Sequence, residues 1–121
     1  GAGQIWSYDP RGESLHLVYE SPGARVVEEP DQGTMSELGG IYVCEDGNLR
    51  GQRIIGLGNG DAPYVVAENA VILHGERNGI EGDFRRSEFT GVTLHDEWMF
   101  VSVQDPGITF AITGPWRGGK V

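Results

Sequence analysis

Turn-forming residues interrupt this chain so often that long regular elements have little room. The sequence contains 20 Gly and 6 Pro among 121 residues, about a fifth of the chain against an average nearer 12%. Each glycine inside a helix costs about 1 kcal/mol relative to alanine, so this density disfavours a helical bundle. Because it suits short strands joined by many turns, we expect a single all-β domain.

Short apolar and β-branched runs, each bounded by turn residues, predict where the strands lie. No run keeps apolar residues at helical spacing over about twelve residues. We expect strands at residues 4–8, 15–19, 31–35, 40–44, 52–57, 64–67, 88–94, 97–104 and 108–113, with a short additional strand at 71–73. Residues 74–87 carry Gly, Asn and charged side chains without periodicity, and they are predicted to form a surface loop.

Part of this pattern repeats along the chain. Tyr42–Gly47 aligns with Val101–Gly107, with one residue inserted before the glycine, and an apolar strand follows each block. The offset between Glu45 and Gln104 is 59 residues, somewhat longer than the roughly 40–50 residues typical of propeller blades, and the predicted loop would supply the insertion. We therefore expect antiparallel β-propeller blades, about two to two and a half of a larger propeller. Residues 1–22 would end one blade, 30–73 would form a whole blade, and 88–116 most of another; an ordinary antiparallel sandwich is the alternative.

Charge and cysteine content exclude several classes of function. The 9 Lys and Arg against 18 Asp and Glu give a net charge of −9. This leaves no basic stripe for nucleic acid, and an anionic membrane surface would repel the chain, so we expect neither partner. The single cysteine, Cys44, excludes an internal disulfide and a multi-cysteine zinc site. An excess of carboxylates is compatible with binding hard cations such as calcium.

Several blocks of this sequence occur in a characteristic order. They are Gly3–Pro10, Leu17–Pro22, Pro30–Gly33, Val43–Gly47, Glu88–Gly91 and Met99–Trp116. In order and spacing they resemble the PhoX-type alkaline phosphatases, a bacterial family of β-propeller enzymes, and the last block is the closest match. Two departures stand out: Gln32 occupies a position where the family usually has Asn, and Leu94–Glu97 replaces a Ser-Pro-Asp-Gly turn.

The resemblance implies an exported phosphatase, periplasmic or secreted, whose substrate is a phosphate monoester and whose cofactors are calcium and ferric iron. It also implies that this chain corresponds to the C-terminal portion of a longer propeller. The expected partners are then the remaining blades or further copies of the chain, and the isolated chain is expected to be inactive. The iron-bridging cysteine of the family belongs to a different motif, so that role is not assigned to Cys44.

Four residues are candidate metal ligands. Glu45 ends a predicted strand at a turn, where propellers collect ligands around their central channel, and the resemblance places a metal ligand at this glutamate. Glu88, which opens the last block, is the second candidate, and Asp31 and Asn69 are further ones. Carboxylate and amide oxygens suit calcium, and carboxylates suit ferric iron. The alternative for each is an ordinary turn residue that makes local hydrogen bonds.

Two further polar residues lie at predicted turns. Asp46 is predicted to be a turn residue, because Asp-Gly favours tight turns. Gln104 aligns with Glu45 in the repeat, but a neutral amide is a poor substitute for a charged ligand, so it is expected to be a hydrogen-bonded turn residue.

A different class of function also stays open: a non-catalytic binding or assembly module built from propeller-type blades.

Overall fold

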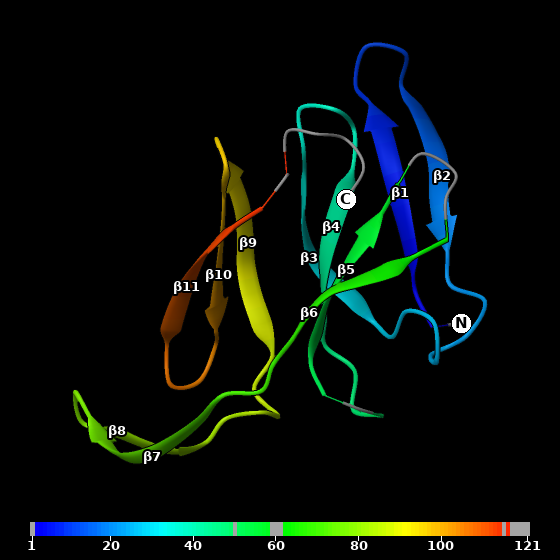
Figure 1. Cartoon of the computed structure of the whole chain (residues 1–121). Helices are drawn as coiled ribbons and strands as arrows, with labels where there is room; N and C mark the ends of the chain where they lie inside the picture. Colours follow the sequence, from blue (N-terminus) through cyan, green and yellow to red (C-terminus); the bar gives the residue numbers. More distant parts are fainter. Residues whose placement is uncertain (1, 50, 59–61, 115, 117–121) are drawn as a thin grey trace.

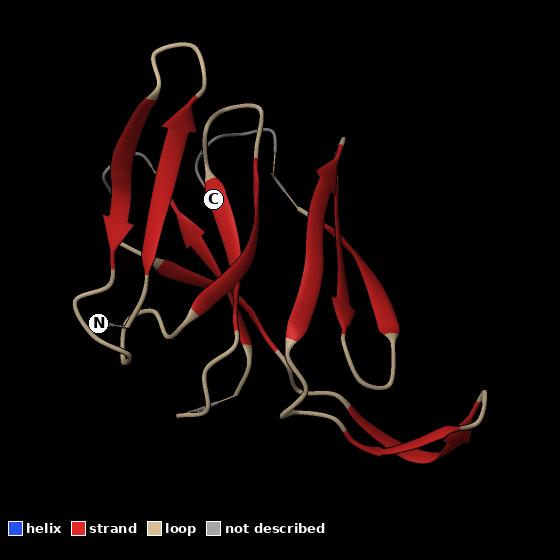
Figure 2. Ribbon diagram, turned by 180° about the vertical axis from the view of Figure 1, so that it is seen from behind, coloured by secondary structure: helices blue, strands red, loops and turns tan. Residues whose placement is uncertain are grey.

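The computed structural model describes residues 2–49, 51–58, 62–114 and 116, and within them the chain is entirely β (Figures 1 and 2). The strands are β1 (Gln4–Asp9), β2 (Ser14–Glu20), β3 (Pro30–Met35), β4 (Ile41–Glu45), β5 (Arg53–Leu57), β6 (Tyr64–Glu68), β7 (Ile72–Arg77), β8 (Ile80–Asp83), β9 (Phe89–His95), β10 (Trp98–Val103) and β11 (Ile108–Thr113). All pairings are antiparallel, which confirms the all-β prediction with blade-like sheets. Over the described residues, none of these sheets closes on itself.

The central sheet has four strands in the order β3-β4-β5-β6, which is their order along the chain. The β1–β2 hairpin lies on one side of it, and the three-stranded sheet β9–β10–β11 lies on the other (Figure 1). Strands β4 and β5 are almost completely buried. Such strands are flanked on both faces, which explains why their sequences read as continuous apolar runs rather than as alternating ones.

Two apolar clusters hold the three sheets together. Tyr42, Cys44 and Ile54 face β9–β11 and pack with buried residues of that sheet, among them Met99 and Val101. The alternate residues of β4 and β5 face the other way: the second cluster consists of Val27, Val43, Ile55 and Leu57, with Ile5 and Tyr19 of the hairpin packed against it. Successive side chains of a strand point to opposite faces, so β4 serves both clusters. The side chains at the end of β4 point to alternate faces in the same way.

The predicted loop at 74–87 is wrong, because most of it forms a hairpin. Strands β7 and β8 pair across a turn in which Asn78 has φ +53° and Gly79 has φ +80°. A two-residue turn with both φ values positive joins antiparallel strands with the correct twist, and Asn-Gly is its preferred sequence. The strands carry charged residues on both faces, so their sequences lack the alternation of apolar and polar residues that predicts a strand. The hairpin extends from the lower end of the molecule (Figure 1).

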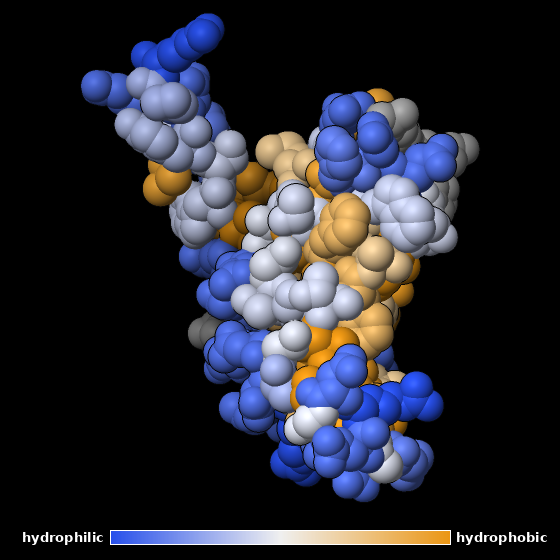
Figure 3. Space-filling view, turned by 90° about the vertical axis from the view of Figure 1, so that its left-hand side faces the viewer, coloured by the Kyte–Doolittle hydropathy of each residue, from blue (hydrophilic) through white to orange (hydrophobic). Residues whose placement is uncertain are grey.

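The surface around these sheets is unevenly polar. On the side of β11, hydrophobic residues gather across the middle of the face, and hydrophilic residues dominate its lower end (Figure 3). Gln32 connects β3 with β9: its Oε1 accepts hydrogen bonds from Thr90 Oγ1 at 2.9 Å and from Gly91 N at 2.6 Å. No helix capable of spanning a membrane occurs in the described part of the chain.

Candidate functional site

Two neighbouring carboxylates at the end of β4 have opposite environments. Glu45 points to the face of Val43 and is only 2% exposed. The register that pairs Val43 with Ile55 and Cys44 with Ile54 brings Glu45 opposite Arg53. The guanidinium donates from Nε to Glu45 Oε2 at 2.5 Å and from Nη2 to Glu45 Oε1 at 2.6 Å. This is a bidentate, buried ion pair.

Both oxygens of Glu45 are therefore engaged within the protein. Oε1 also accepts a hydrogen bond from the backbone N–H of Glu28 at 2.7 Å, while Arg53 Nη2 donates to the carbonyl of Val26 at 3.2 Å. The pair thus ties the segment before β3 to the central sheet. A metal at Glu45 would have to displace Arg53, and the predicted ligand role of Glu45 stays a prediction.

The turn after Glu45 is held in place by a second buried carboxylate. Glu28 is 8% exposed and accepts hydrogen bonds from the backbone N–H groups of Asn48 and Leu49, at 3.1 and 3.2 Å to Oε1. Gly47 passes so close to the Glu28 carboxylate that a Cβ there would collide with it. Asp46 N also donates to Glu29 O at 3.1 Å. The backbone that carries Asp46 is consequently fixed.

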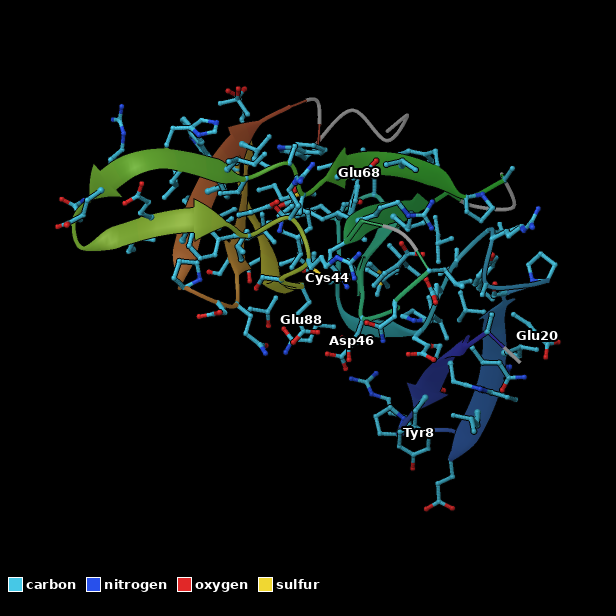
Figure 4. The ribbon with its side chains drawn as sticks, turned by 90° about the horizontal axis from the view of Figure 1, so that it is seen from below. Tyr8, Glu20, Cys44, Asp46, Glu68 and Glu88 are labelled. Atoms are coloured by element: carbon cyan, nitrogen blue, oxygen red, sulfur yellow. The ribbon has the colours of Figure 1, made fainter. Side chains whose placement is uncertain are left out.

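Asp46 itself turns to the opposite face, where it meets Glu88. A hydrogen bond with the Asp46 carboxyl, partial burial and the negative charges of Asp46 and Asp31 raise the pKa of Glu88. The side chain of Gln104 also hydrogen-bonds Glu88, and the backbone N–H of Gln104 donates to the Glu88 carbonyl at 3.0 Å. Figure 4 shows Asp46 and Glu88 close together at the end of the molecule viewed from below.

Among the described residues, the charges that act on the Glu88 carboxyl are those of Asp46 and Asp31, and both are negative. Two nearby carboxylates disfavour each other's ionised form, and a cation between them would remove that cost. The donors are carboxylate and amide oxygens, the ligand types that calcium prefers. Within the described residues, however, no group of three or more His, Cys, Asp or Glu side chains is arranged to hold a metal ion. The pair Asp46–Glu88 fits a cation only as part of a larger ligand set.

The structure gives Asn69 a structural setting. It is 3% exposed, and its Nδ2 donates to the carbonyls of Phe84 and Ser87, both at 2.8 Å. Its Oδ1 accepts from the backbone N–H of Val71 at 3.0 Å. Asn69 therefore fastens the end of β6 to the segment before β9. All its amide atoms are used, and its predicted ligand role stays a prediction.

Cys44 lies near the Asp46 and Glu88 carboxylates in the view of Figure 4. It is 1% exposed, and burial raises the pKa of its thiol to about 11, with smaller contributions from the charges of Asp31 and Glu88. A thiol in this state is a poor nucleophile and a poor ligand, because both roles need the thiolate. The structure is thus in keeping with a packing role for Cys44.

Comparison with protein families connects this geometry to a known class. The family described as alkaline phosphatase PhoX matches residues 1–107. The chain belongs to the PhoX alkaline phosphatase family. That family is generally metal-dependent, and carboxylate oxygens such as those of Asp46 and Glu88 are among the ligands that calcium prefers. No curated protein and no solved structure gives a significant match.

For this PhoX-family chain, sequence reasoning missed two residues that define the site. Asp46 was expected to serve only the turn, yet its carboxyl is the partner of Glu88. Strand alternation is the signal that finds it: Asp46 follows Cys44 by two residues, so it shares the face toward β9. Arg53 was not singled out at all. A buried Glu at one end of a hairpin predicts a cation opposite it on the partner strand, because an unpaired buried charge is very costly.

Proposed function

We propose that this chain contributes Asp46 and Glu88 to the metal centre of a phosphomonoesterase, with Asp31 beside them. The observation that supports this most directly is the contact between the Glu88 and Asp46 carboxyls, together with the raised pKa that it gives Glu88. Membership of the PhoX family supports the reaction class, which is the hydrolysis of a phosphate monoester. The same membership supports an exported, periplasmic or secreted location.

Each side chain has a defined task in this proposal. Asp46 and Glu88 supply charged oxygen ligands, for calcium in the first place and for ferric iron as the second candidate. Gln104 orients the Glu88 carboxylate through its hydrogen bond. Glu28 keeps the Asp46 turn rigid from behind. When bound, such cations stabilise charge on the phosphoryl oxygens and lower the pKa of a bound water. The remaining ligands would come from water, substrate or other blades.

A calcium titration tests the ligand role. A ligand that binds only the folded state stabilises it in proportion to the logarithm of its concentration. We expect calcium to raise the melting temperature of the parent chain, and to raise that of Glu88→Gln much less. Glu97→Gln is the matched control, since Glu97 lies in the turn at the far end of β9. Equal calcium responses in the parent and Glu88→Gln would refute the proposal.

The second candidate is a non-catalytic binding or assembly module. It is favoured by the incomplete ligand set among the described residues. A chromogenic phosphomonoester assay with added iron and calcium separates the two. We expect the chain alone to show little turnover, and to gain activity only together with the blades that complete the ligand set. A metal-independent rate in the parent that Glu88→Gln leaves unchanged would contradict a role for this pair in catalysis.

A further inference from the structure

The central sheet and the three-stranded sheet meet at their edge strands. β3 is an end strand of the four-stranded sheet, and β9 is an end strand of the three-stranded sheet. Among the described residues the two strands are in contact but share no ladder, and they lie side by side in Figure 1. Asp31 is the second residue of β3, and Glu88 immediately precedes β9. The distance between these two acids therefore depends on how the two edges are held together.

A bulge in β3 lets two consecutive residues act toward β9. The register of β3 against β4 shifts so that Asp31 and Gln32 together lie opposite Cys44. In a regular strand neighbouring side chains point to opposite faces, whereas a bulge re-aims one of them. The Gln32 side chain reaches β9, and the negative charge of Asp31 contributes to the raised pKa values of Cys44 and Glu88. Both residues of the bulge therefore act on the same side of β3.

A second bulge, in β9, presents a donor to Gln32. Gly91 and Val92 together lie opposite Val101 of β10, and Gly91 has φ +65°, in the left-handed region that glycine enters without strain. The extra residue of a bulge is left out of the ladder. The Gly91 N–H donates to Gln32 Oε1 at 2.6 Å, and the Gly91 carbonyl accepts from Thr93 Oγ1 at 3.2 Å. Both polar backbone groups of Gly91 are therefore held by side chains.

Gln32 holds the two bulges together through a single oxygen atom. Its Oε1 also accepts a hydrogen bond from Thr90 Oγ1 at 2.9 Å, so the oxygen is shared between two donors of β9. An amide oxygen has two lone pairs and can accept both bonds. Thr90 and Gly91 follow Glu88 by two and three residues, and Gln32 directly follows Asp31. The two hydrogen bonds therefore limit how far the backbone of Asp31 can move from that of Glu88.

We propose that Gln32 is a positioning residue: its hydrogen bonds to β9 hold the Asp31 carboxylate near the Asp46–Glu88 pair, where its negative charge strengthens the attraction of the pair for calcium. The inference rests on the proposed function, because that function supplies the cation. Without a cation Asp31 and Glu88 repel each other, and the neutral amide of Gln32 opposes their separation without adding charge. A group that is held in place before the cation arrives loses less conformational entropy on binding.

The calcium affinity of the whole chain, measured by titration calorimetry, tests this role. Gln32→Met keeps the length of the side chain and removes the acceptor oxygen. We expect it to weaken calcium binding about threefold, and Asp31→Asn about fivefold, the order expected when one negative charge acts through water on a divalent cation. In the Asp31→Asn background Gln32→Met should have no further effect, because Gln32 acts through Asp31. Gln4→Met, at another exposed strand glutamine on β1, is the matched control and should leave the affinity unchanged.

Backbone NMR without calcium distinguishes failure of this inference from failure of the proposed function. In Gln32→Met the Gly91 amide proton signal should move upfield, because it loses its acceptor, and the order parameter of the Asp31 amide should fall. An unchanged Gly91 signal, an unchanged Asp31 order parameter, or additive losses of calcium affinity in the double variant would overturn the inference. Equal calcium affinity in the parent and Gln32→Met would also overturn it. If the parent binds no calcium, the proposed function fails instead, and the metal-free measurements still decide whether Gln32 holds Asp31 in place.

Discussion

Glu45 and Asp46 are adjacent in the chain, and the protein treats their charges in opposite ways. Glu45 is buried against Arg53 and a backbone N–H, so its charge is compensated inside the fold. Asp46 faces another carboxyl, Glu88, with Asp31 adding a further negative charge. A compensated carboxylate stabilises structure, whereas an uncompensated one has charge available for a ligand. The charge environment of each carboxylate therefore distinguishes a structural acid from a candidate metal ligand better than its residue type does.

The largest expected effect comes from removing the cation that pairs with Glu45. Arg53→Met leaves the Glu45 carboxylate buried without its cation, which typically costs about 3–5 kcal/mol. We expect a loss of this size in the free energy of unfolding, measured by urea denaturation. The double variant Glu45→Gln, Arg53→Met should recover at least half of it, because the remaining amide oxygen still accepts from Glu28 N–H. A loss below about 1 kcal/mol in Arg53→Met would contradict the structural role.

Asp46→Asn removes the negative charge beside Glu88, and its effect on the free energy of unfolding should be much smaller. Without metal, the substitution removes repulsion from Glu88 and keeps the shape of the side chain. We expect the free energy of unfolding at pH 7 to stay within about 0.5 kcal/mol of the parent, or to rise slightly, as for most surface substitutions. The same urea measurement with and without calcium checks this. A loss above about 2 kcal/mol without metal would show that Asp46 is structural after all.

The two sides of β4 also show how far sequence reasoning reaches. Most strands were predictable because turn residues bound short apolar runs, and β4 and β5 stood out because both faces are buried. The β7–β8 hairpin was missed because its strands bury little, so no alternation marked them, and only Asn78-Gly79 revealed the turn. Glu88 was a candidate because it opens the last block of the family resemblance, but its contact with Asp46 was not predicted. A long-range contact between the β4–β5 turn and the start of β9 depends on how two sheets pack.

The smallest expected effect is the pH dependence that Glu88 confers. Its pKa is raised in the folded state, chiefly by the hydrogen bond with Asp46, from the ordinary value near 4.5. For an acid with a raised folded pKa, the stabilising contribution is fully present below the unfolded pKa and is lost as pH rises through the folded pKa. Relative to Glu88→Gln, the parent should therefore be most stable near pH 4 and lose that advantage on going to pH 7.

Melting temperatures of the parent and Glu88→Gln across this pH range isolate the effect, since every other titrating group, including the Glu45–Arg53 pair, is common to both proteins. Calcium sharpens the test, because a cation at the pair favours the ionised carboxylates and should reverse the loss above the folded pKa. A carbon-13 titration of the Glu88 carboxyl gives the direction independently. A midpoint at or below the ordinary value would mean that Asp46 does not raise the pKa of Glu88, and the contrast between the two faces of β4 would then lose its electrostatic basis.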